Sequence, residues 1–266
     1  MSKRVARIAL LFLLAGSLWA FQRGIRNLFP DSDDETPPAD GNEKAEFMWA
    51  RLRYSNFQGG GGMWARRGAW TVDYPKADRQ FLQGVRRLTR LQTRSMEHIV
   101  DLISDDIFDY PFVYAVEVGH WSLPDAQARK LREFTDRGGF LMTDDFHGTF
   151  EWDVFTTSLN KGFGDRPITD IENDDPIFHV VFDLNDRVQV PGIVNYPFTT
   201  QTYEYDGFEP KWRAVRDDKG RIVVGICHNM DQGDAWEWAD SPRYPEKYAS
   251  QAYRTGINYI IYAMTH

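Results

Sequence analysis

An apolar run from Ile222 to Cys227 passes directly into a stretch that is dense in polar and aromatic side chains, His228 to Trp238. An unbroken apolar run of this length is typical of a strand that is buried on both faces of a parallel sheet. Open α/β sheets place their ligand sites just beyond the carboxyl ends of such strands. The pattern therefore predicts a covered parallel sheet and indicates the edge of that sheet where a functional site should lie.

The same kind of pattern recurs along the chain and alternates with helical periodicity. Further strands are predicted at Arg51–Ser55, Ile99–Ile103, Phe112–Val118 and Phe140–Thr143, and helices at about 75–88, 124–137, 150–159 and 249–264. Residues 177–182 and 211–215 are also expected to be extended, and 183–207 is expected to form an irregular insertion or hairpin. This alternation favours an α/β fold, with a doubly wound and mainly parallel sheet in a single domain.

Residues 1–20 are predicted to be a signal peptide or an uncleaved N-terminal anchor. Three basic residues precede an apolar run, Ile8 to Ala20, that is shorter than the roughly 20 residues of a comfortable membrane span. We expect export to the periplasm or cell envelope, with cleavage favoured over a retained membrane tether. Residues 21–45 are acidic and proline-rich and are predicted to be a linker, which leaves 46–266 as the folded domain.

The chain carries a formal net charge of −8 at pH 7. A negative surface repels phosphate backbones, so nucleic acid is not expected as a partner. The single cysteine, Cys227, excludes an internal disulfide and is expected to be a packed residue of its strand.

Polar side chains follow three of the predicted strands at the point where each strand ends. The candidate ligand-binding residues are Glu117, His120, Asp144, Asp145, His147, His228, Asn229, Asp231, Asp234 and Trp236. Because the carboxyl ends of parallel strands share one edge of a sheet, we expect these side chains to converge. Carboxylates and imidazoles together can hold a divalent metal or act as general acid and base, and Asp145, His147 and Asp231 are the catalytic candidates. Apart from such a metal, no cofactor is identified.

Each of these residues also has an ordinary structural interpretation. Loops after strands are polar in general, and of the pair Asp144 and Asp145 one would cap the next helix while the other stays exposed. Trp236 and Trp238 beside carboxylates are typical of sugar-binding surfaces, but tryptophan also packs well in a core. The run Gly59–Gly62 lacks the pattern of a phosphate-binding loop and is expected to be a flap or a simple connection.

Three segments carry a resemblance to a known family: Trp70–Asp78, Gly138–Asp145 and His228–Glu237. Together they resemble the bacterial family called domain of unknown function 4159, over nearly all of Phe47 to His266. The resemblance implies a flavodoxin-like fold similar to that of class I glutamine amidotransferases. It implies no established activity.

The nucleophile of those amidotransferases has no counterpart in this sequence. In that family a glycine-rich elbow after a central strand presents a cysteine, whereas Phe140–Thr143 is followed by Asp144 to Gly148, without cysteine or serine. Cys227 and His228 are adjacent strand residues that point to opposite faces, so they cannot form a dyad. We therefore do not expect glutaminase chemistry.

The sequence leaves three hypotheses for function. The favoured one is an exported domain that binds a small polar ligand or an envelope partner at the strand ends. The second is a metal-assisted hydrolase that acts on envelope carbohydrate or peptide. The third is a structural assembly module whose polar residues only stabilise loops. Whether the protein is an enzyme stays open.

Overall fold

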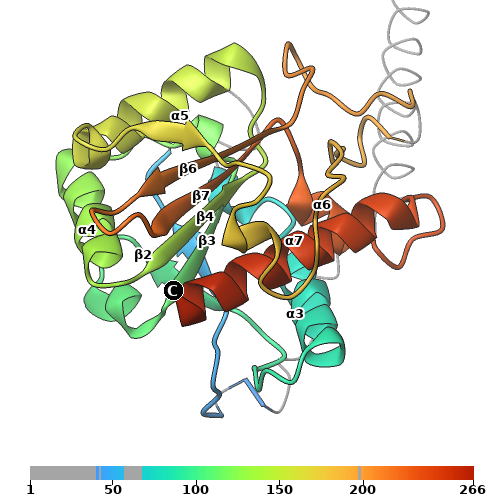
Figure 1. The fold of residues 1–266 in the computed structure, drawn as a ribbon, viewed down its shortest axis with the longest axis horizontal. Coiled ribbons are helices and arrows are strands. Elements are labelled where there is room, and N and C mark those ends of the chain that lie inside the picture. Colours follow the sequence, from blue (N-terminus) through green and yellow to red (C-terminus); the bar gives the residue numbers. More distant parts are fainter. Residues whose placement is uncertain (1–39, 42, 57–67, 197–198) are drawn as a thin grey trace, which may run out of the picture. The chain divides into compact units, whose positions relative to one another are not determined.

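The computed structural model describes residues 40–41, 43–56, 68–196 and 199–266, all within the unit Pro37–His266 (Figure 1). The predicted signal peptide or anchor, nearly all of the predicted linker and the run Gly59–Gly62 lie outside the described residues. Among the residues that are described, no helix combines the length and the apolar character that a membrane crossing requires.

Seven strands of the described chain form one mixed sheet, in the order β2-β1-β3-β4-β7-β6-β5. The strands are β1 Ala50–Arg53, β2 His98–Asp101, β3 Phe112–Val116, β4 Phe140–Asp144, β5 Ile168–Asp170, β6 Lys211–Arg216 and β7 Ile222–His228. Neighbours from β2 to β7 are parallel, whereas β6 and β5 extend the sheet in antiparallel pairs. The predicted α/β class is confirmed, and the antiparallel edge is an addition to it.

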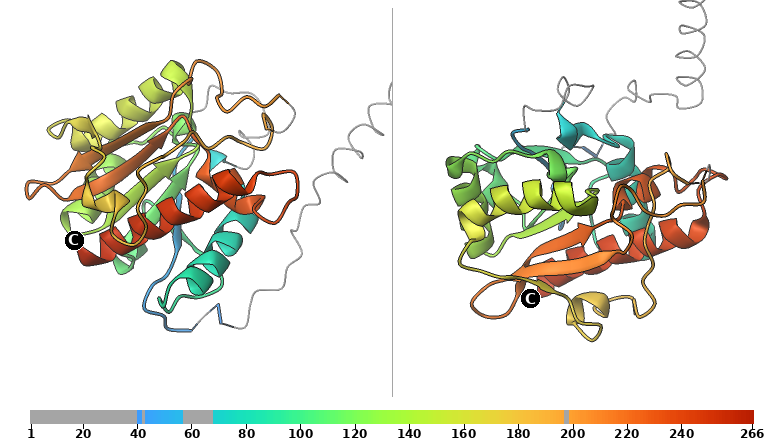
Figure 2. Two further views of the ribbon diagram at one scale, coloured as in Figure 1. Left: turned by 45° about the vertical axis from the view of Figure 1, so that its right-hand side comes forward. Right: turned by 90° about the horizontal axis from the view of Figure 1, so that it is seen from above.

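Helices cover both faces of this sheet (Figure 2). They are α3 Lys76–Leu88, α4 Asp125–Asp136, α5 Gly148–Phe163, α6 Gln232–Glu237 and α7 Glu246–Thr265, with short 3-10 helices η1 Ala69–Thr71, η2 Asp105–Asp109, η3 Val118–His120 and η4 Pro176–Phe178. Successive residues of β3 show the two layers. Tyr114 lies in a core with α3, α6 and α7, and Ala115 lies in a core with α4 and α5. Because side chains alternate along a strand, β3 is buried on both faces, as its apolar run predicts.

Residues 177–182 were expected to be extended, and this prediction is wrong: 177–178 belong to η4, and 179–182 form a turn and a bend. Asp175 accepts a hydrogen bond from the Ile177 amide at 3.0 Å, and Pro176 occupies the first turn. A cap and a proline at these positions favour a helical turn over a strand. The described part of 183–207 contains no helix or strand, as expected for an irregular insertion.

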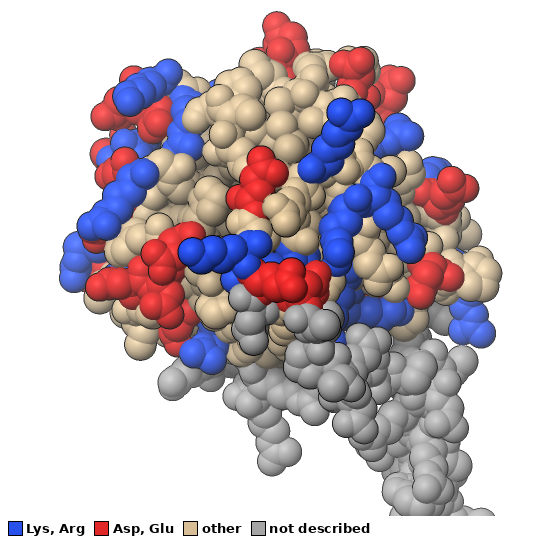
Figure 3. Space-filling model, turned by 90° about the horizontal axis from the view of Figure 1, so that it is seen from below, with Lys and Arg blue, Asp and Glu red and all other residues tan. Residues whose placement is uncertain are grey.

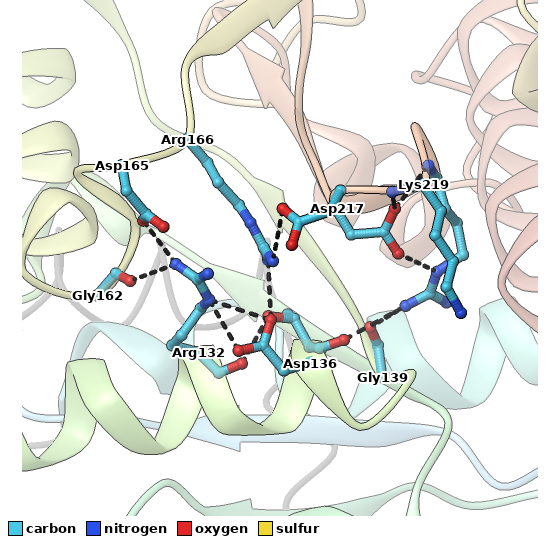
Figure 4. A network of polar contacts seen from close by, with 11 residues as sticks. Arg132, Asp136, Gly139, Gly162, Asp165, Arg166, Asp217 and Lys219 are labelled. Carbon is cyan, nitrogen blue, oxygen red and sulfur yellow. Dashed lines mark hydrogen bonds and ion pairs between the residues drawn. The ribbon is translucent and has the colours of Figure 1, made fainter.

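Ion pairs tie α4 to the end of α5 near the amino end of β4 (Figure 4). Arg132 of α4 contacts Asp136 at 2.9 Å and Asp165 at 2.6 Å. Arg166 also contacts Asp136, at 2.9 Å. These contacts stabilise the edge of the sheet that lies opposite to the predicted site.

A cavity of about 770 Å³ lies beside this network. Two of its arginines are already paired, Arg216 with Asp175 at 2.5 Å and Arg221 with Asp217 at 3.4 Å. The face of the molecule drawn in Figure 3 carries Lys and Arg interspersed with Asp and Glu. Both partner carboxylates belong to the same lining, so neither arginine is left as an unpaired charge for an anionic ligand.

A buried ion pair lies under the loop that precedes α3. The side chains of Arg51 in β1 and Asp78 in α3 are fully buried, and the Nη2–Oδ2 distance is 2.7 Å. Arg51 also donates hydrogen bonds to the backbone carbonyls of Trp70 and Val72, at 3.0 and 2.9 Å. The pair therefore anchors the loop that carries Asp73.

Replacement of Arg51 by alanine should lower the free energy of unfolding by about 3–5 kcal/mol, because it leaves the Asp78 carboxylate buried without its partner. Arg53, on the same strand, provides a matched control: it pairs with Asp101 at 2.9 Å, but its side chain is 49 % exposed. Arg53→Ala should change stability by no more than about 1 kcal/mol. Urea unfolding measures both values, and equal losses would contradict a structural role for the buried pair.

Candidate functional site

A cavity of about 320 Å³ opens at the carboxyl edge of the sheet, where β3, β4 and β7 end. Its lining contains the carboxylates Asp73, Glu117, Asp145, Glu151, Glu204, Asp231 and Asp234, the histidines His120 and His147, and Val72, Ile193, Val194 and Tyr205. None of the described residues that line it is a lysine or an arginine. The lining therefore offers many hydrogen-bond acceptors and no fixed positive charge.

Two of the carboxylates leave neighbouring strands side by side. Val116 and Asp144 are register partners in β3 and β4, and the residues that follow them are Glu117 and Asp145. These two residues have φ angles of 54° and 53°, and Asp73 has a φ of 59°. The left-handed region costs a non-glycine residue about 1 kcal/mol or more, and such strain is concentrated at functional sites. Three lining carboxylates are thus directed into the site by strained backbone.

Asp231 and Asp234 are positioned by the short helix α6. Asp231 is the N-cap of this helix and accepts a hydrogen bond from the Asp234 amide at 2.7 Å. Asp234 in turn accepts one from the Ile193 amide at 2.6 Å. A β-carbon at Gly192 would lie only 3.0 Å from Asp231 Oδ2 and 3.1 Å from Glu204 Oε1. Because this position has no side chain, carboxylates from α6 and from the irregular segment can approach one another.

Burial and mutual repulsion change the titration of these carboxylates. Burial raises the pKa of Asp145 well above its usual value, and the neighbouring Glu117 raises it further. The pKa of Asp231 is raised by burial and then by Asp145. Burial also raises the pKa of Glu151 to about 7. At neutral pH such a cavity must hold either protons or a compensating cation.

The two histidines of the cavity have different properties. His147 is 3 % exposed, and burial lowers its pKa to about 3, so its ring is neutral. Its Nε2 lies 3.2 Å from Asp145 Oδ1, and its Nδ1 has no hydrogen-bond partner within the described part of the chain. The side chain of His120 is 38 % exposed, and its hydrogen bond to Glu117 raises its pKa. His147 is therefore a buried neutral base, whereas His120 is half of an accessible ion pair.

The structure brings most of the predicted site residues together. The candidates that line the cavity are Glu117, His120, Asp145, His147, Asp231 and Asp234, and those that do not are Asp144, His228, Asn229 and Trp236. The six residues that line the cavity converge at the strand ends as predicted. The other four lie outside the cavity and contact the elements that form it.

The ordinary interpretation of the aspartate pair is wrong for Asp145, which is 7 % exposed and lines the cavity. Asp144 does accept hydrogen bonds at the start of a helix, as that interpretation expects, but the helix is α6 and not α5, which is the next in the chain. Asp144 Oδ2 accepts hydrogen bonds from the Tyr114 hydroxyl at 3.0 Å and from the amides of Gln232 and Gly233 at 2.8 and 3.1 Å. It therefore orients the helix that carries Asp231 and Asp234.

The other three residues outside the cavity have structural contacts. His228 Nε2 lies 3.1 Å from the carbonyl oxygen of Gly148, and the side-chain oxygen of Asn229 accepts a hydrogen bond from the Gly148 amide at 2.8 Å. Trp236 is fully buried, with its ring centroid 4.3 Å from that of Phe81. The sugar-binding interpretation of Trp236 is therefore wrong, because the ring is core.

Three carboxylates that line the cavity were not among the site residues predicted from the sequence: Asp73, Glu151 and Glu204. Glu151 lies four residues after His147 and its Oε2 accepts a hydrogen bond from the His147 amide at 2.6 Å. That spacing at a helix start was a usable signal, since residues four apart face each other. Asp73 and Glu204 lie in loops, where no periodicity marks a direction.

Three sets of side chains in or beside the cavity can hold a metal ion. They are Asp73, Asp145 and Asp231; Glu117, His120 and Glu151; and Asp73, Asp234 and Glu237, and the donor atoms within each set all lie within 4.8 Å of one another. Two oxygens on opposite sides of a calcium ion, each about 2.4 Å from it, are about 4.8 Å apart. A single ion can therefore reach all three donors of a set.

Without metal, the protein should lose stability as the pH rises from about 5 to about 8. A carboxyl whose pKa is raised on folding contributes stability that is complete below its unfolded pKa and is lost as the pH rises through the folded value. For Glu151, a folded pKa of about 7 against the ordinary 4.5 corresponds to at most about 3 kcal/mol.

Glu151→Gln should remove this part of the pH dependence, because glutamine does not titrate. Asp153→Asn, which changes an exposed carboxylate of the same helix, is the control and should leave the dependence unchanged. The measurement is urea unfolding in the presence of chelator at the two pH values. An unchanged slope in Glu151→Gln would show that the buried carboxyl is not the titrating group.

A comparison with functionally curated proteins gives no match. The profile of the family described as "Domain of unknown function (DUF4159)" matches residues 49–264. This range includes the whole sheet and every residue that lines the cavity. The resemblance seen in the three sequence segments is thus confirmed, and the chain belongs to the family described as "Domain of unknown function (DUF4159)".

Proposed function

We propose that this protein binds a divalent cation in the acidic cavity and, through that ion, a small polar ligand. The observation that carries the proposal is the convergence of Asp73, Asp145 and Asp231, whose carboxylate oxygens lie within 4.8 Å of one another. Burial raises the pKa of all three. A bound ion would offset the repulsion that otherwise has to be relieved by protons.

The donor set and the size of the cavity limit the ion and the ligand. Oxygen donors alone favour a hard cation such as Mg²⁺, Mn²⁺ or Ca²⁺. These ions take about six or more ligands, so three carboxylates leave coordination positions open to the cavity. A volume of about 320 Å³ lies at the small end of ligand sites, which suits a small polar molecule.

We also propose that the domain has the flavodoxin-like arrangement of class I glutamine amidotransferases. The parallel strands, numbered among themselves, follow the order 2-1-3-4-5 that is typical of flavodoxin-like sheets. Asp73 follows β1 and Glu117 follows β3, so the cavity borders the point where the strand order reverses. Glutaminase chemistry forms no part of the proposal, since β4 is followed by Asp145 and Cys227 is fully buried.

Export to the periplasm or cell envelope remains part of the proposal. Its support is the basic start and apolar run of residues 1–20, which act as a signal peptide or as a membrane anchor. In that compartment the ligand would be a small envelope molecule or a group presented by an envelope protein.

Calorimetric titration of the full chain with Mn²⁺ or Ca²⁺ tests the proposed ion site. Asp231→Asn should weaken binding at least about tenfold, because it removes a charged donor from the oxygen set while asparagine can still cap α6. Asp153→Asn is again the matched control and should bind as the wild type does. Bound ion should also raise the midpoint of thermal unfolding.

Two results would contradict this proposal. One is the absence of ion binding by the wild type, and the other is equal affinity in Asp231→Asn and the control. If the wild type binds no ion and Asp231→Asn does not fold, the structural assembly module is the better hypothesis.

A second candidate function is a metal-assisted hydrolase of envelope carbohydrate or peptide. The observation that favours it is the position of His147, whose Nε2 lies 3.2 Å from Asp145 Oδ1 and whose Nδ1 has no partner in the described structure. A metal ion lowers the pKa of bound water, and a neutral imidazole can accept the proton. Asp145 and Asp231 would then hold the metal, and His147 would be the general base.

His147→Gln should distinguish this candidate from ligand binding alone. It should reduce hydrolysis by roughly 10²- to 10⁴-fold, because a general base is lost, while Mn²⁺ affinity stays within a few-fold. The measurement is product release from a panel of cell-wall glycans and peptides by the Mn²⁺-loaded protein. No release from any of them by the wild type would speak against the hydrolase.

A further inference from the structure

A second set of metal donors lies beside the three aspartates. Glu117 and His120 are at the two ends of η3, and Glu151 is in the first turn of α5. His120 Nδ1 lies 2.9 Å from Glu117 Oε2, and its Nε2 lies 3.8 Å from Glu151 Oε1. The donor atoms of the three side chains all lie within 4.8 Å of one another, so this set can also surround one ion.

The two sets are neighbours because β3 and β4 are neighbours. Glu117 belongs to the second set and Asp145 to the oxygen set, and each follows a member of the register pair Val116 and Asp144. Adjacent strands are about 4.8 Å apart, so Glu117 and Asp145 leave the sheet side by side. Both sets line the same cavity.

His147 lies between the two sets and contacts a member of each. His147 is 3 % exposed and lines the cavity, yet its Nδ1 has no hydrogen-bond partner in the described chain. Its ring contacts Asp145 of the oxygen set at 3.2 Å, and its backbone amide donates to Glu151 of the second set at 2.6 Å. A buried polar atom without a partner costs about 1–3 kcal/mol, so its retention here points to a ligand.

The charge of the two donor sets favours two ions over one. The two sets contain five carboxylates, Asp73, Asp145, Asp231, Glu117 and Glu151. One divalent ion would leave most of this negative charge without compensation, whereas two ions nearly cancel it. The described lining has no lysine or arginine that could take the place of the second ion.

We propose that the cavity is a dinuclear metal centre, with one ion bound by Asp73, Asp145 and Asp231 and a second bound by Glu117, His120 and Glu151. This inference rests on the proposed function, which requires only the first ion. The oxygen set suits a hard cation, whereas the imidazole of His120 makes the second set suitable for Mn²⁺, Fe²⁺ or Zn²⁺. Mn²⁺ fits both sets and is therefore the probe of choice.

The test is the binding of Mn²⁺ to the full chain, followed by metal analysis and electron paramagnetic resonance. The wild type should bind two Mn²⁺ per chain and show the exchange coupling of neighbouring ions. His120→Ala should bind one and lose the coupling, since the oxygen set is untouched. His179→Ala removes a histidine that pairs with Asp183 at 2.9 Å outside the cavity, and this control should keep both ions.

The outcomes separate this inference from the proposed function. One Mn²⁺ in the wild type, unchanged by His120→Ala, overturns the dinuclear centre and leaves the single ion site standing. No bound Mn²⁺ overturns both. If His120→Ala does not fold, Glu117→Gln takes its place and should likewise reduce two coupled ions to one. Two coupled ions in either folded variant would show that the second set is not the ligand.

Discussion

The structure depends on one electrostatic constraint: carboxylates that are buried close together cannot all be ionised unless positive charge offsets them. Seven carboxylates line a single cavity, and the described lining supplies no cationic side chain other than the histidines. His147 is neutral, since burial lowers its pKa to about 3. Protons can satisfy the constraint at low pH, and divalent cations can satisfy it at neutral pH. The chemistry of the cavity follows from whichever of the two is present.

Polar groups outside the cavity hold the segments that carry its carboxylates. The buried pair of Arg51 and Asp78 holds the carbonyls that precede Asp73. Asp144 accepts the first amides of α6 and thereby aims Asp231 into the cavity. The strain of the left-handed backbone at the strand ends is sustained because the surrounding sheet and both helical layers are well packed. The free energy gained by packing in the two cores therefore offsets the cost of placing several carboxylates close together at the carboxyl ends of the strands.

Much of this arrangement could be predicted from the sequence, and the remainder could not, for physical reasons. Apolar runs located every strand of the sheet except β5, and the parallel order then placed the residues after β3, β4 and β7 at one edge. The sequence pattern does not predict which of the residues at the end of a strand has its side chain in the cavity. Asp144 still follows the strand alternation and faces Tyr114, whereas Asp145 leaves it with a φ of 53°. Asp73 and Glu204 come from loops, where only the tertiary structure determines direction.

The most direct test of metal binding in this cavity is a crystal structure of the protein grown with Mn²⁺ and measured at a wavelength where manganese scatters anomalously. We predict an anomalous peak within coordination distance of Asp73, Asp145 and Asp231, and a second beside Glu117, His120 and Glu151. A cavity without an anomalous peak at saturating Mn²⁺, with these carboxylates in the positions described, would contradict this prediction. In that case protons alone would satisfy the constraint.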